Sequence, residues 1–478
     1  MANITSPGIG SGLDVSGIVS QLVALERKPI DKLEDVASTI QTRISAFGKV
    51  QSLYSTLRDA AAALGKSTLW QQTTATASDA TALSVSASGG AATGSYSVQV
   101  AKLAQAHALA SAPLAGATAA VGTGTLKIEL GSWNADNTAF TARSGATPVE
   151  IPIGDGDNTL QKIRDKINAA NAGVTAAIVT DASGARLTLR SKETGATQAL
   201  RITATDAGGA PTTSGLGTLA FDPPGGATGL TQTQAARNAE ATLNGLAITS
   251  ESNTLSGVLD GASITLLKET GTTAVNVAVA SDTTAMKTAL TAFTSAYNAL
   301  NSYLAEQTKY DESTKTAGTL QGDSTAIGLR NQMRGLLRAG STASGAFGSL
   351  TDIGFNVQRD GSISTDPGKL EKAFAKLPEL AKLFSSADDS SADKLGFGQR
   401  FRQLADQVTG SEGTLTTRNE GLKAQLKRNS DEQDRLEDKV ARTQERLLKQ
   451  YSALDTQMGQ LSSLSTYMSS QVAQWNKS

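Results

Sequence analysis

Apolar residues recur at steps of three and four along both ends of the chain, which is the spacing of one face of an α-helix. Near the N-terminus the stripe runs through residues 14–64, with Asp14 placed to cap the helix. Pro29 restarts the pattern within this segment. Near the C-terminus the stripe returns at residue 283 and is clearest over residues 415–475, where it repeats as heptads. Both chain ends are therefore predicted to form long helices with a coiled-coil-like seam.

The charged positions of the C-terminal helix also follow the helical repeat. Acidic residues on its solvent face stand four residues before basic ones, the favoured order for ion pairs along a helix. A long solvated helix explains these charges without any ligand. The expected pairs are Asp431–Arg435, Asp438–Arg442 and Glu445–Lys449.

Between about residues 70 and 284 the rhythm changes to alternation of apolar and polar positions, with frequent glycine, serine and threonine. This pattern predicts half-buried β-strands. The clearest examples are Tyr96–Val100, Thr125–Leu130 and Arg186–Arg190. One amphipathic helix over residues 159–170 interrupts the strands.

Several shorter segments have signals of their own. Residues 204–235 are rich in glycine and proline, so we expect a loop or a disordered insertion there. Later in the chain the spacing predicts helices over residues 323–338 and 368–386. A hairpin-like stretch between them is expected to turn at residues 359–361.

The order of these segments predicts a nested α+β multidomain fold. A coiled-coil-like helical terminal domain is formed by both chain ends and carries β-rich inserted domains, one within the other. The expected divisions are residues 1–40 with 440–478 as terminal coiled-coil legs, 41–70 with 283–439 as a helical domain, 71–104 with 236–282 as a β-rich domain, and 105–235 as an inserted outer β-rich domain.

Composition narrows the possible functions. Lysine and arginine total 43 and aspartate and glutamate total 44, so no global charge favours nucleic acid or an anionic membrane. The chain contains no cysteine, which excludes disulfides, thiol nucleophiles and cysteine-ligated metals. Its single histidine, His107, has no partner residues at a telling spacing. We therefore expect His107 to be a surface or packing residue, and we expect no catalytic site, cofactor or metal.

Two glycine-containing segments resemble ligand loops only superficially. Residues 154–158 lack the third acidic ligand and the final glutamate of a calcium loop. Residues 8–12 lack the Gly-Lys-Ser/Thr of a phosphate loop. The N-terminus also lacks the basic and apolar regions of a secretory signal, and no run of 18 apolar residues predicts a membrane span.

The last segment of the chain is apolar and nearly uncharged. Only Asp455 and Lys477 are charged among residues 450–478. This stripe has too few apolar side chains to offset the entropy of ordering the segment by itself. We therefore expect an intermolecular role for it, and an ordinary intramolecular bundle is the alternative.

The opening of the chain resembles a known family. Pro7-Gly-Ile-Gly-Ser-Gly-Leu-Asp-Val15, followed by Ile18-Val-Ser-Gln-Leu22, is similar to the start of the flagellar filament-capping proteins of the hook-associated protein 2 family. Gly94–Gln105 resembles the strand that enters the family's β region, and Thr159–Gly195 resembles its flagellin-type insertion repeat. Leu320-Gln-Gly-Asp-Ser324 continues the resemblance toward the C-terminus. One departure is Asp260, where proline often stands before Gly261 in the family.

The resemblance implies a structural cap at the distal tip of the bacterial flagellum. Such a protein promotes ordered insertion of exported flagellin and prevents loss of monomers. The resemblance further implies a homo-oligomer, expected to be a pentamer, whose terminal legs reach flagellin or the hook–filament junction proteins. It implies secretion through the flagellar type III apparatus and a cytoplasmic export chaperone at the C-terminal tail. Neither nucleic acid binding nor membrane insertion is expected.

The residues expected to contact another subunit or flagellin are the apolar stripes of the two ends. Two alternatives to a cap remain open at this point: a flagellin-like or hook-junction structural protein, and a surface adhesin that uses the β-rich domains. The candidate contact residues are Leu13, Val15, Ile18, Leu22, Leu25, Leu454, Met458, Leu461, Met468, Val472 and Trp475.

Overall fold

The computed structural model describes residues 14–475 and divides the chain into two compact units. One unit, here the helical unit, is formed by the chain up to Trp70 and again from Thr283. The other, here the β unit, spans Gln71–Asp282. This confirms the predicted nested α+β architecture, in which both chain ends form one helical unit and the β-rich unit is inserted between them in the sequence. The finer four-part division stays a prediction.

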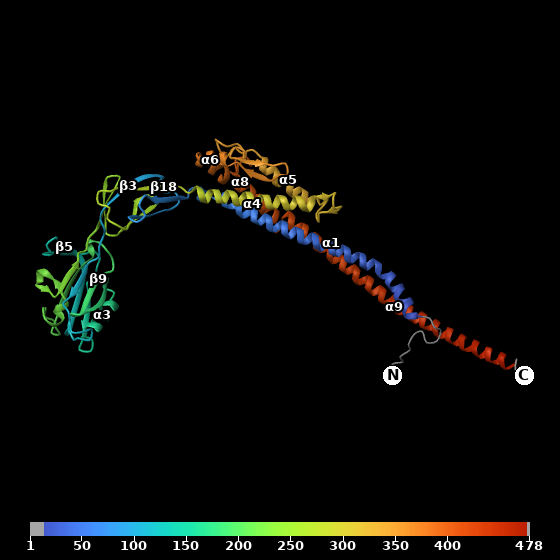
Figure 1. Ribbon diagram of the computed structural model, residues 1–478, viewed down its shortest axis with the longest axis horizontal. Coiled ribbons are helices and arrows are strands. Elements are labelled where there is room, and N and C mark those ends of the chain that lie inside the picture. Colours follow the sequence, from blue (N-terminus) through green and yellow to red (C-terminus); the bar gives the residue numbers. More distant parts are fainter. Residues whose placement is uncertain (1–13, 476–478) are drawn as a thin grey trace. The chain divides into compact units, whose positions relative to one another are not determined.

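The helical unit contains long helices, short helices and two small hairpins (Figure 1). Its helices are α1 Val15–Leu64, α2 Ser67–Trp70, α4 Thr283–Thr308, α5 Ser324–Arg338, α6 Pro367–Phe374, α7 Leu377–Ser385, α8 Phe397–Thr409 and α9 Thr414–Trp475. Its hairpins are β19 Tyr310–Asp311 with β20 Thr316–Ala317, and β21 Phe355–Val357 with β22 Ile363–Thr365.

The two longest helices, α1 and α9, run antiparallel along one seam (Figure 1). The Asp14 carboxylate caps α1 by accepting a hydrogen bond from the Gly17 amide at 2.8 Å, as the sequence predicted. The helix then continues through Pro29 without a break. Ile30, the next residue, is fully buried, so packing of the seam compensates for the hydrogen bond that proline cannot donate.

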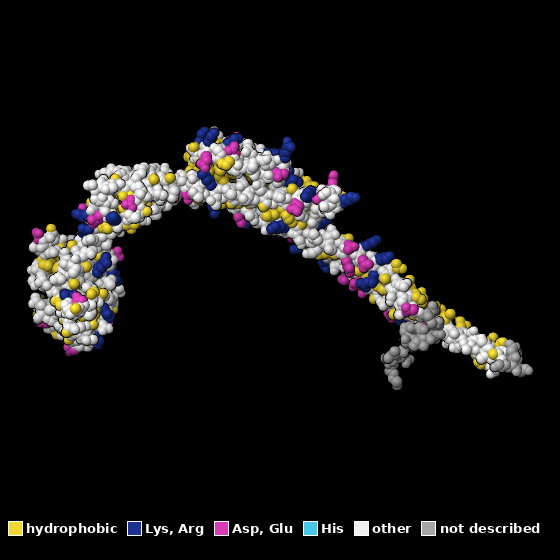
Figure 2. Space-filling model, viewed as in Figure 1, with side chains coloured by type: hydrophobic (Ala, Val, Ile, Leu, Met, Phe, Trp, Pro, Cys, Tyr) yellow, Lys and Arg dark blue, Asp and Glu magenta, His cyan; other side chains and the backbone are white. Residues whose placement is uncertain are grey.

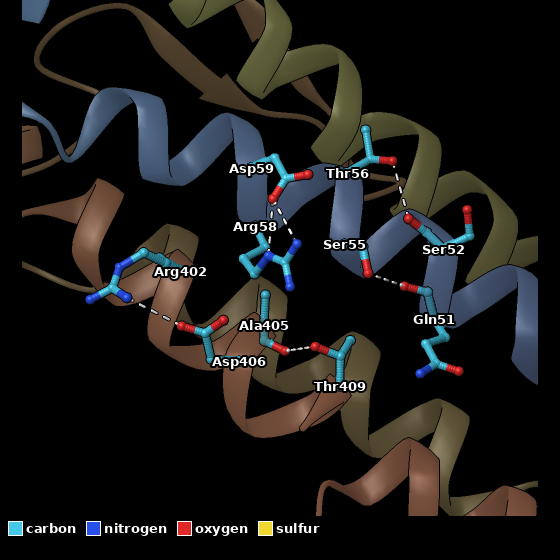
Figure 3. A network of polar contacts seen from close by, with 10 residues as sticks. All are labelled: Gln51, Ser52, Ser55, Thr56, Arg58, Asp59, Arg402, Ala405, Asp406 and Thr409. Atoms are coloured by element: carbon cyan, nitrogen blue, oxygen red, sulfur yellow. Dashed lines mark hydrogen bonds and ion pairs between the residues drawn. The ribbon is translucent and has the colours of Figure 1, made fainter. Parts of the chain in front are cut away.

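The core of the helical unit lies where α1 packs on α4 and α8. Phe401 of α8 meets the ring of Phe293 edge-on, with ring centroids 5.1 Å apart, and Tyr297 lies beside the same ring. Figure 3 shows polar contacts of α1 and α8, each of which stays within one helix, such as Arg402 with Asp406. Apolar packing joins these helices, and Gln399 of α8 adds a hydrogen bond of 2.9 Å from its Nε2 to the Gly65 backbone oxygen at the end of α1.

The β unit contains two hydrophobic cores, and all its strand pairs are antiparallel. The first core lies between a sheet ordered β1-β18-β3-β14-β15 and a sheet ordered β16-β17-β2. These strands are β1 Thr73–Ala77, β2 Leu83–Ala87, β3 Gly94–Lys102, β14 Ala239–Leu243, β15 Leu246–Ser250, β16 Thr254–Leu259, β17 Ala262–Leu266 and β18 Val275–Ser281.

The second core lies between a sheet ordered β12-β11-β10-β5-β6, with β7 also on β5, and a sheet ordered β13-β4-β9-β8 that packs against α3. Thr159 caps α3, whose buried face confirms the predicted helix. The elements are β4 Ala108–Ser111, β5 Gly124–Trp133, β6 Phe140–Ala142, β7 Val149–Ile153, α3 Leu160–Ala169, β8 Val174–Asp181, β9 Gly184–Ser191, β10 Ala199–Thr205, β11 Phe221–Asp222, β12 Ala227–Thr228 and β13 Leu230–Gln234.

The structure corrects the expectation of a loop or disordered insertion over residues 204–235. This segment is ordered and contributes β11, β12 and β13 to the sheets of the second core. Leu216, Phe221 and Leu230 are each at most 5% exposed. Glycines and prolines separate these apolar residues and hide any periodicity, but each side chain still fills a position in the core.

Two smaller expectations were also wrong. The helix predicted over residues 368–386 is divided into α6 and α7, because Ala375 ends the first and Pro378 stands at the start of the second. On α9 only the Glu445–Lys449 pair forms as expected, with 2.7 Å between Nζ and Oε1. Asp431 pairs instead with Lys427, and Arg435 with Glu432. An exposed charged side chain can pair with an opposite charge three or four residues before or after it, and these pairs have similar energies. The spacing in the sequence therefore does not select one partner.

His107, directly before β4, is a buried packing residue with 1% of its surface exposed. Its Nδ1 accepts a hydrogen bond from the Leu200 amide at 3.0 Å. Its Nε2 lies 3.3 Å from Oε1 of Gln232 and therefore carries the proton of the neutral ring. Burial lowers the pKa of His107. A second proton, on Nδ1, would place two N–H donors, that of the ring and that of the Leu200 amide, against each other. This contact therefore favours the neutral imidazole.

We predict that His107 makes the protein less stable in mild acid. Below about pH 6.5 the unfolded chain takes up a proton that the buried ring does not. The free energy of unfolding should therefore fall with decreasing pH, by at most about 1.4 kcal/mol per pH unit from this residue, until the lowered folded-state pKa is reached.

The measurement is denaturant unfolding of the full chain and of His107→Gln between pH 7.5 and 5.5. The variant should lose this component of the pH dependence. Because His107 is the only histidine, its ring proton signal in NMR gives an independent titration midpoint, expected below 6.5. A midpoint at or above 6.5 would contradict the prediction.

Candidate assembly surface

The C-terminal part of α9 carries a row of exposed apolar side chains, here called the tail stripe. Their exposed fractions lie between 43% and 61%, far above those of the seam residues nearer the start of the helix. In Figure 2 hydrophobic side chains recur along this tail. The tail stripe consists of Leu454, Met458, Leu461, Leu464, Tyr467, Met468 and Val472.

The register between α1 and α9 explains this exposure. Nζ of Lys439 lies 3.8 Å from a carboxylate oxygen of Glu26, and the guanidinium carbon of Arg418 lies 5.9 Å from the ring centroid of Phe47. Both contacts fit one antiparallel register, in which Val15 at the start of α1 lies opposite about residue 450 of α9. The tail stripe therefore begins where the described part of α1 ends.

Charged groups are scarce along this part of α9, whose polar positions are mostly serine, threonine and glutamine. Asp455 is the only charged residue from 450 to 474, whereas charged residues are frequent from 418 to 449. Asp455 is itself buried, with 8% exposed. A continuous row of exposed large apolar side chains is unusual on a surface that stays in water, so the tail stripe has the character of a surface that another chain covers.

The candidate residues at the N-terminal end have a different environment. Val15 is 1% exposed and Ile18 and Leu22 are half-buried, so their apolar surface is largely covered within the chain. Leu25 is 56% exposed. Leu13 and the side chain of Trp475 lie outside the described residues. The contact of any of these residues with another chain stays a prediction.

Sequence reasoning left two tail residues out of the candidate set. Leu464 and Tyr467 are 58% and 60% exposed, as much as the predicted Leu461. They stand beside the heptad seam rather than on it, so a strict heptad reading omits them. The apolar content of the tail is the signal that includes them.

The structure shows no further chemistry around the tail. Within residues 14–475 no cluster of three histidine, cysteine or acidic side chains is placed to hold a metal ion. In the same range no helix is both long enough and apolar enough to cross a membrane. What the described geometry does offer is an uncharged apolar helix face.

Comparison with known protein families supports the resemblance seen in the sequence. The model of the flagellar hook-associated protein 2 N-terminus matches residues 11–107, and that of its C-terminus matches residues 236–463. A flagellin hook IN motif matches residues 135–193, which overlaps the segment that resembles an insertion repeat.

Individual relatives align over nearly the whole chain. The B-type flagellar hook-associated protein 2 of Pseudomonas aeruginosa is 32% identical, over 96% of this chain and 95% of its own length. The flagellar hook-associated protein 2 of Escherichia coli K12 is 29% identical, over 98% of both chains.

A solved structure shares the fold. The D1-D2-D3 domains of the flagellar cap protein FliD from Escherichia coli superpose with a TM-score of 0.62 at 27% identity, covering 79% of this chain and 99% of that one. The helical ends and the β-rich insertion are shared, and the relatives align over nearly the full length. The chain therefore belongs to the flagellar hook-associated protein 2 family.

Proposed function

We propose that this chain holds its place in the cap at the tip of the flagellar filament by burying the tail stripe of α9 against another protein chain. As a member of its family, the protein is a structural cap that promotes ordered insertion of flagellin and prevents the loss of monomers. The family forms oligomers on flagellin filaments. The single observation that carries the proposal is the exposure of seven apolar side chains on the nearly uncharged C-terminal end of α9.

The magnitude of the tail stripe suits a stable contact. Full burial of a large apolar side chain contributes about 1.5–3 kcal/mol. Because each of the seven is already about half covered, burying the remainder would contribute roughly 5–10 kcal/mol. This gross gain is of the same order as the entropy cost of association, about 4–15 kcal/mol, so a stable contact needs the tail stripe together with further contacts of the assembly.

The finer details of the assembly are part of the same proposal. The oligomer is a pentamer, and its terminal legs contact flagellin and the hook–filament junction proteins. Before export the tail stripe is held by a cytoplasmic chaperone, because an uncharged apolar helix needs a cover in every compartment. The chain then leaves the cell through the flagellar type III apparatus and acts without catalysis. The sequence resemblance and the exposed tail support these statements.

We predict that Leu461→Asp prevents stable capping. Leu461 belongs to the tail stripe and is 60% exposed. Its aspartate variant should therefore fold normally. In the assembly the carboxylate would be buried without a partner, which costs several kcal/mol. The contact should weaken on the order of a hundredfold or more. The readouts are swimming motility and unpolymerised flagellin in the medium.

Thr466→Asp is the matched control, because Thr466 is exposed and no member of the tail stripe stands three or four residues from it. It should cap normally. Export of both variants must be equal, since loss of chaperone binding would also lower the amount of cap protein outside the cell. Normal motility with Leu461→Asp at equal export would show that the tail stripe is not the attachment.

Truncation after Tyr451 tests the whole stripe. The β unit has its own two cores within Gln71–Asp282, so the shortened chain should remain soluble and folded. Cells that carry it should secrete flagellin monomers and swim poorly. If the truncated protein is exported at the normal level and motility is unchanged, α9 is not the leg that holds the cap.

Hydrogen exchange should show when the tail becomes covered. In the isolated chain the amides of residues 454–474 should exchange fast, because few side chains pack around them. In assembled caps their exchange should slow by about tenfold or more. Residues 46–64 of α1, which lie in the core, serve as the internal control and should be protected in both states. Equal protection of the tail in a dilute monomer would mean that the tail is covered within its own chain.

A further inference from the structure

Helix α5 carries three arginines on one face, here called the arginine row. Arg330, Arg334 and Arg338 stand one helical turn apart, and α5 contains no acidic residue. Like charges at this spacing destabilise an isolated helix. Among the described residues none of the three forms an ion pair, although the chain as a whole is close to neutral. The row is therefore a local excess of positive charge.

The groups that contact the row are neutral acceptors. Arg334 donates from Nε to Oδ1 of Asn301 at 3.0 Å and from Nη2 to the backbone oxygen of Asp360. The Asp360 carboxylate lies nearby, but it accepts hydrogen bonds from the amide and hydroxyl of Ser362 and so belongs to the β21–β22 turn. These contacts fix the position of Arg334 without pairing its charge with a carboxylate.

Two buried donors beside the row have no partner. The hydroxyl of Tyr297, a residue with 0% exposure, and Nε of Arg330 lack any hydrogen bond. Burial raises the pKa of Tyr297 to about 12, and all three arginines of the row are close enough to oppose that rise. Burial and the charge of Arg334 lower the pKa of Arg330. The Tyr297 hydroxyl lies too deep for an external ligand, whereas the exposed guanidinium of Arg338 is accessible to an incoming carboxylate.

The length of the row indicates the kind of anion. Eight residues of helix separate Arg330 from Arg338, about 12 Å at 1.5 Å per residue. A single phosphate reaches only part of the row, whereas two carboxylates one helical turn apart on a polypeptide, about 6 Å, can each face one of two neighbouring arginines. The helical unit presents such a set on α9, where Asp434 and Asp438 stand one turn apart with Glu437 between them. All three are exposed and form no ion pair within the described chain.

We propose that the arginine row is a docking surface for the acidic segment Asp434–Asp438 of α9 from a second copy of this chain. Row and segment occupy different surfaces of the same subunit, so the contact is heterologous and each subunit can both give and receive it. Repetition of such a contact builds a closed ring when the rotation closes, which suits a cap. This inference rests on the proposed function, because it adds a lateral subunit contact to the attachment made by the tail stripe.

Charge reversal tests the contact in the full chain. Arg338 is the exposed member of the row, so Arg338→Glu should fold normally. It should weaken self-association in sedimentation velocity by about five- to tenfold. Asp438→Arg should have a similar effect, and the two changes combined in one chain should recover most of the loss. Arg190→Glu, the same change at an exposed arginine of β9, is the matched control and should leave association unchanged.

Wild-type association should also weaken as salt is raised from about 0.05 to 0.5 M.

Cross-linking gives a second, geometric readout. The chain has no cysteine, so Arg338→Cys and Asp438→Cys introduce the only thiols when the two variants are mixed. The pair should form a disulfide-linked dimer, and Arg338→Cys mixed with Arg190→Cys should not.

The inference is overturned if Arg338→Glu associates like Arg190→Glu, if Asp438→Arg fails to rescue it, or if the wild-type chain stays monomeric at every concentration. Inhibition of association by added phosphate alone, without rescue by Asp438→Arg, would instead identify a small-anion site and equally reject the second copy. Leu461→Asp separates the two proposals, because it should abolish attachment to the filament and leave the charge-dependent association intact.

Discussion

The antiparallel packing of α1 against α9 is the interaction on which the rest of the structure depends. It joins the two ends of the chain, although nearly all other residues lie between them in sequence. The entropy of closing a loop grows only slowly with its length, so one apolar seam can hold both ends while a complete β unit is inserted. Because α4 and α8 pack on the same helix, α1 also organises the core of the helical unit.

This pairing also determines which part of α9 is left for other chains. α9 has 62 residues and α1 has 50, and their register leaves the tail stripe past the described start of α1. Along the paired part, exposed charges keep the helix soluble. Along the tail they are replaced by serine, threonine, glutamine and apolar residues. The charged composition suits a helix whose outer face stays in water. The uncharged, partly apolar composition of the tail suits a helix face that another chain covers.

Charge is distributed in an equally local way within the helical unit. The total is close to zero, but positive charge is concentrated on α5 and negative charge on one segment of α9. Long-range attraction is weak for such a molecule, because salt screens exposed charges beyond about 8–10 Å. Close contact between complementary patches can still fix the orientation of two subunits, a role for which charge is better suited than for affinity.

The sequence by itself determined the helical ends, the β-rich insertion and the apolar tail, because each depends on a periodicity or a composition that is local. The spacing from residue 415 to 475 is sufficient to predict a helix whatever packs against it, and the lack of charge beyond residue 450 marks that segment as unusual. α8 has the same spacing at Phe397, Phe401, Ala405 and Val408 but was not predicted, because glycines flank this short pattern and interrupt it at Gly398.

Only the tertiary structure decided how these elements share their surfaces. Residues 204–235 have no periodicity, and their burial depends on gaps that strands distant in sequence create. The burial of His107, the exposure of Leu25 on the same helix as a buried Val15, and the lack of ion pairs in the arginine row depend on which helix or strand lies opposite. A sequence records what each residue is able to contact. Which contacts form depends on the register between segments far apart along the chain, and no local pattern encodes that register.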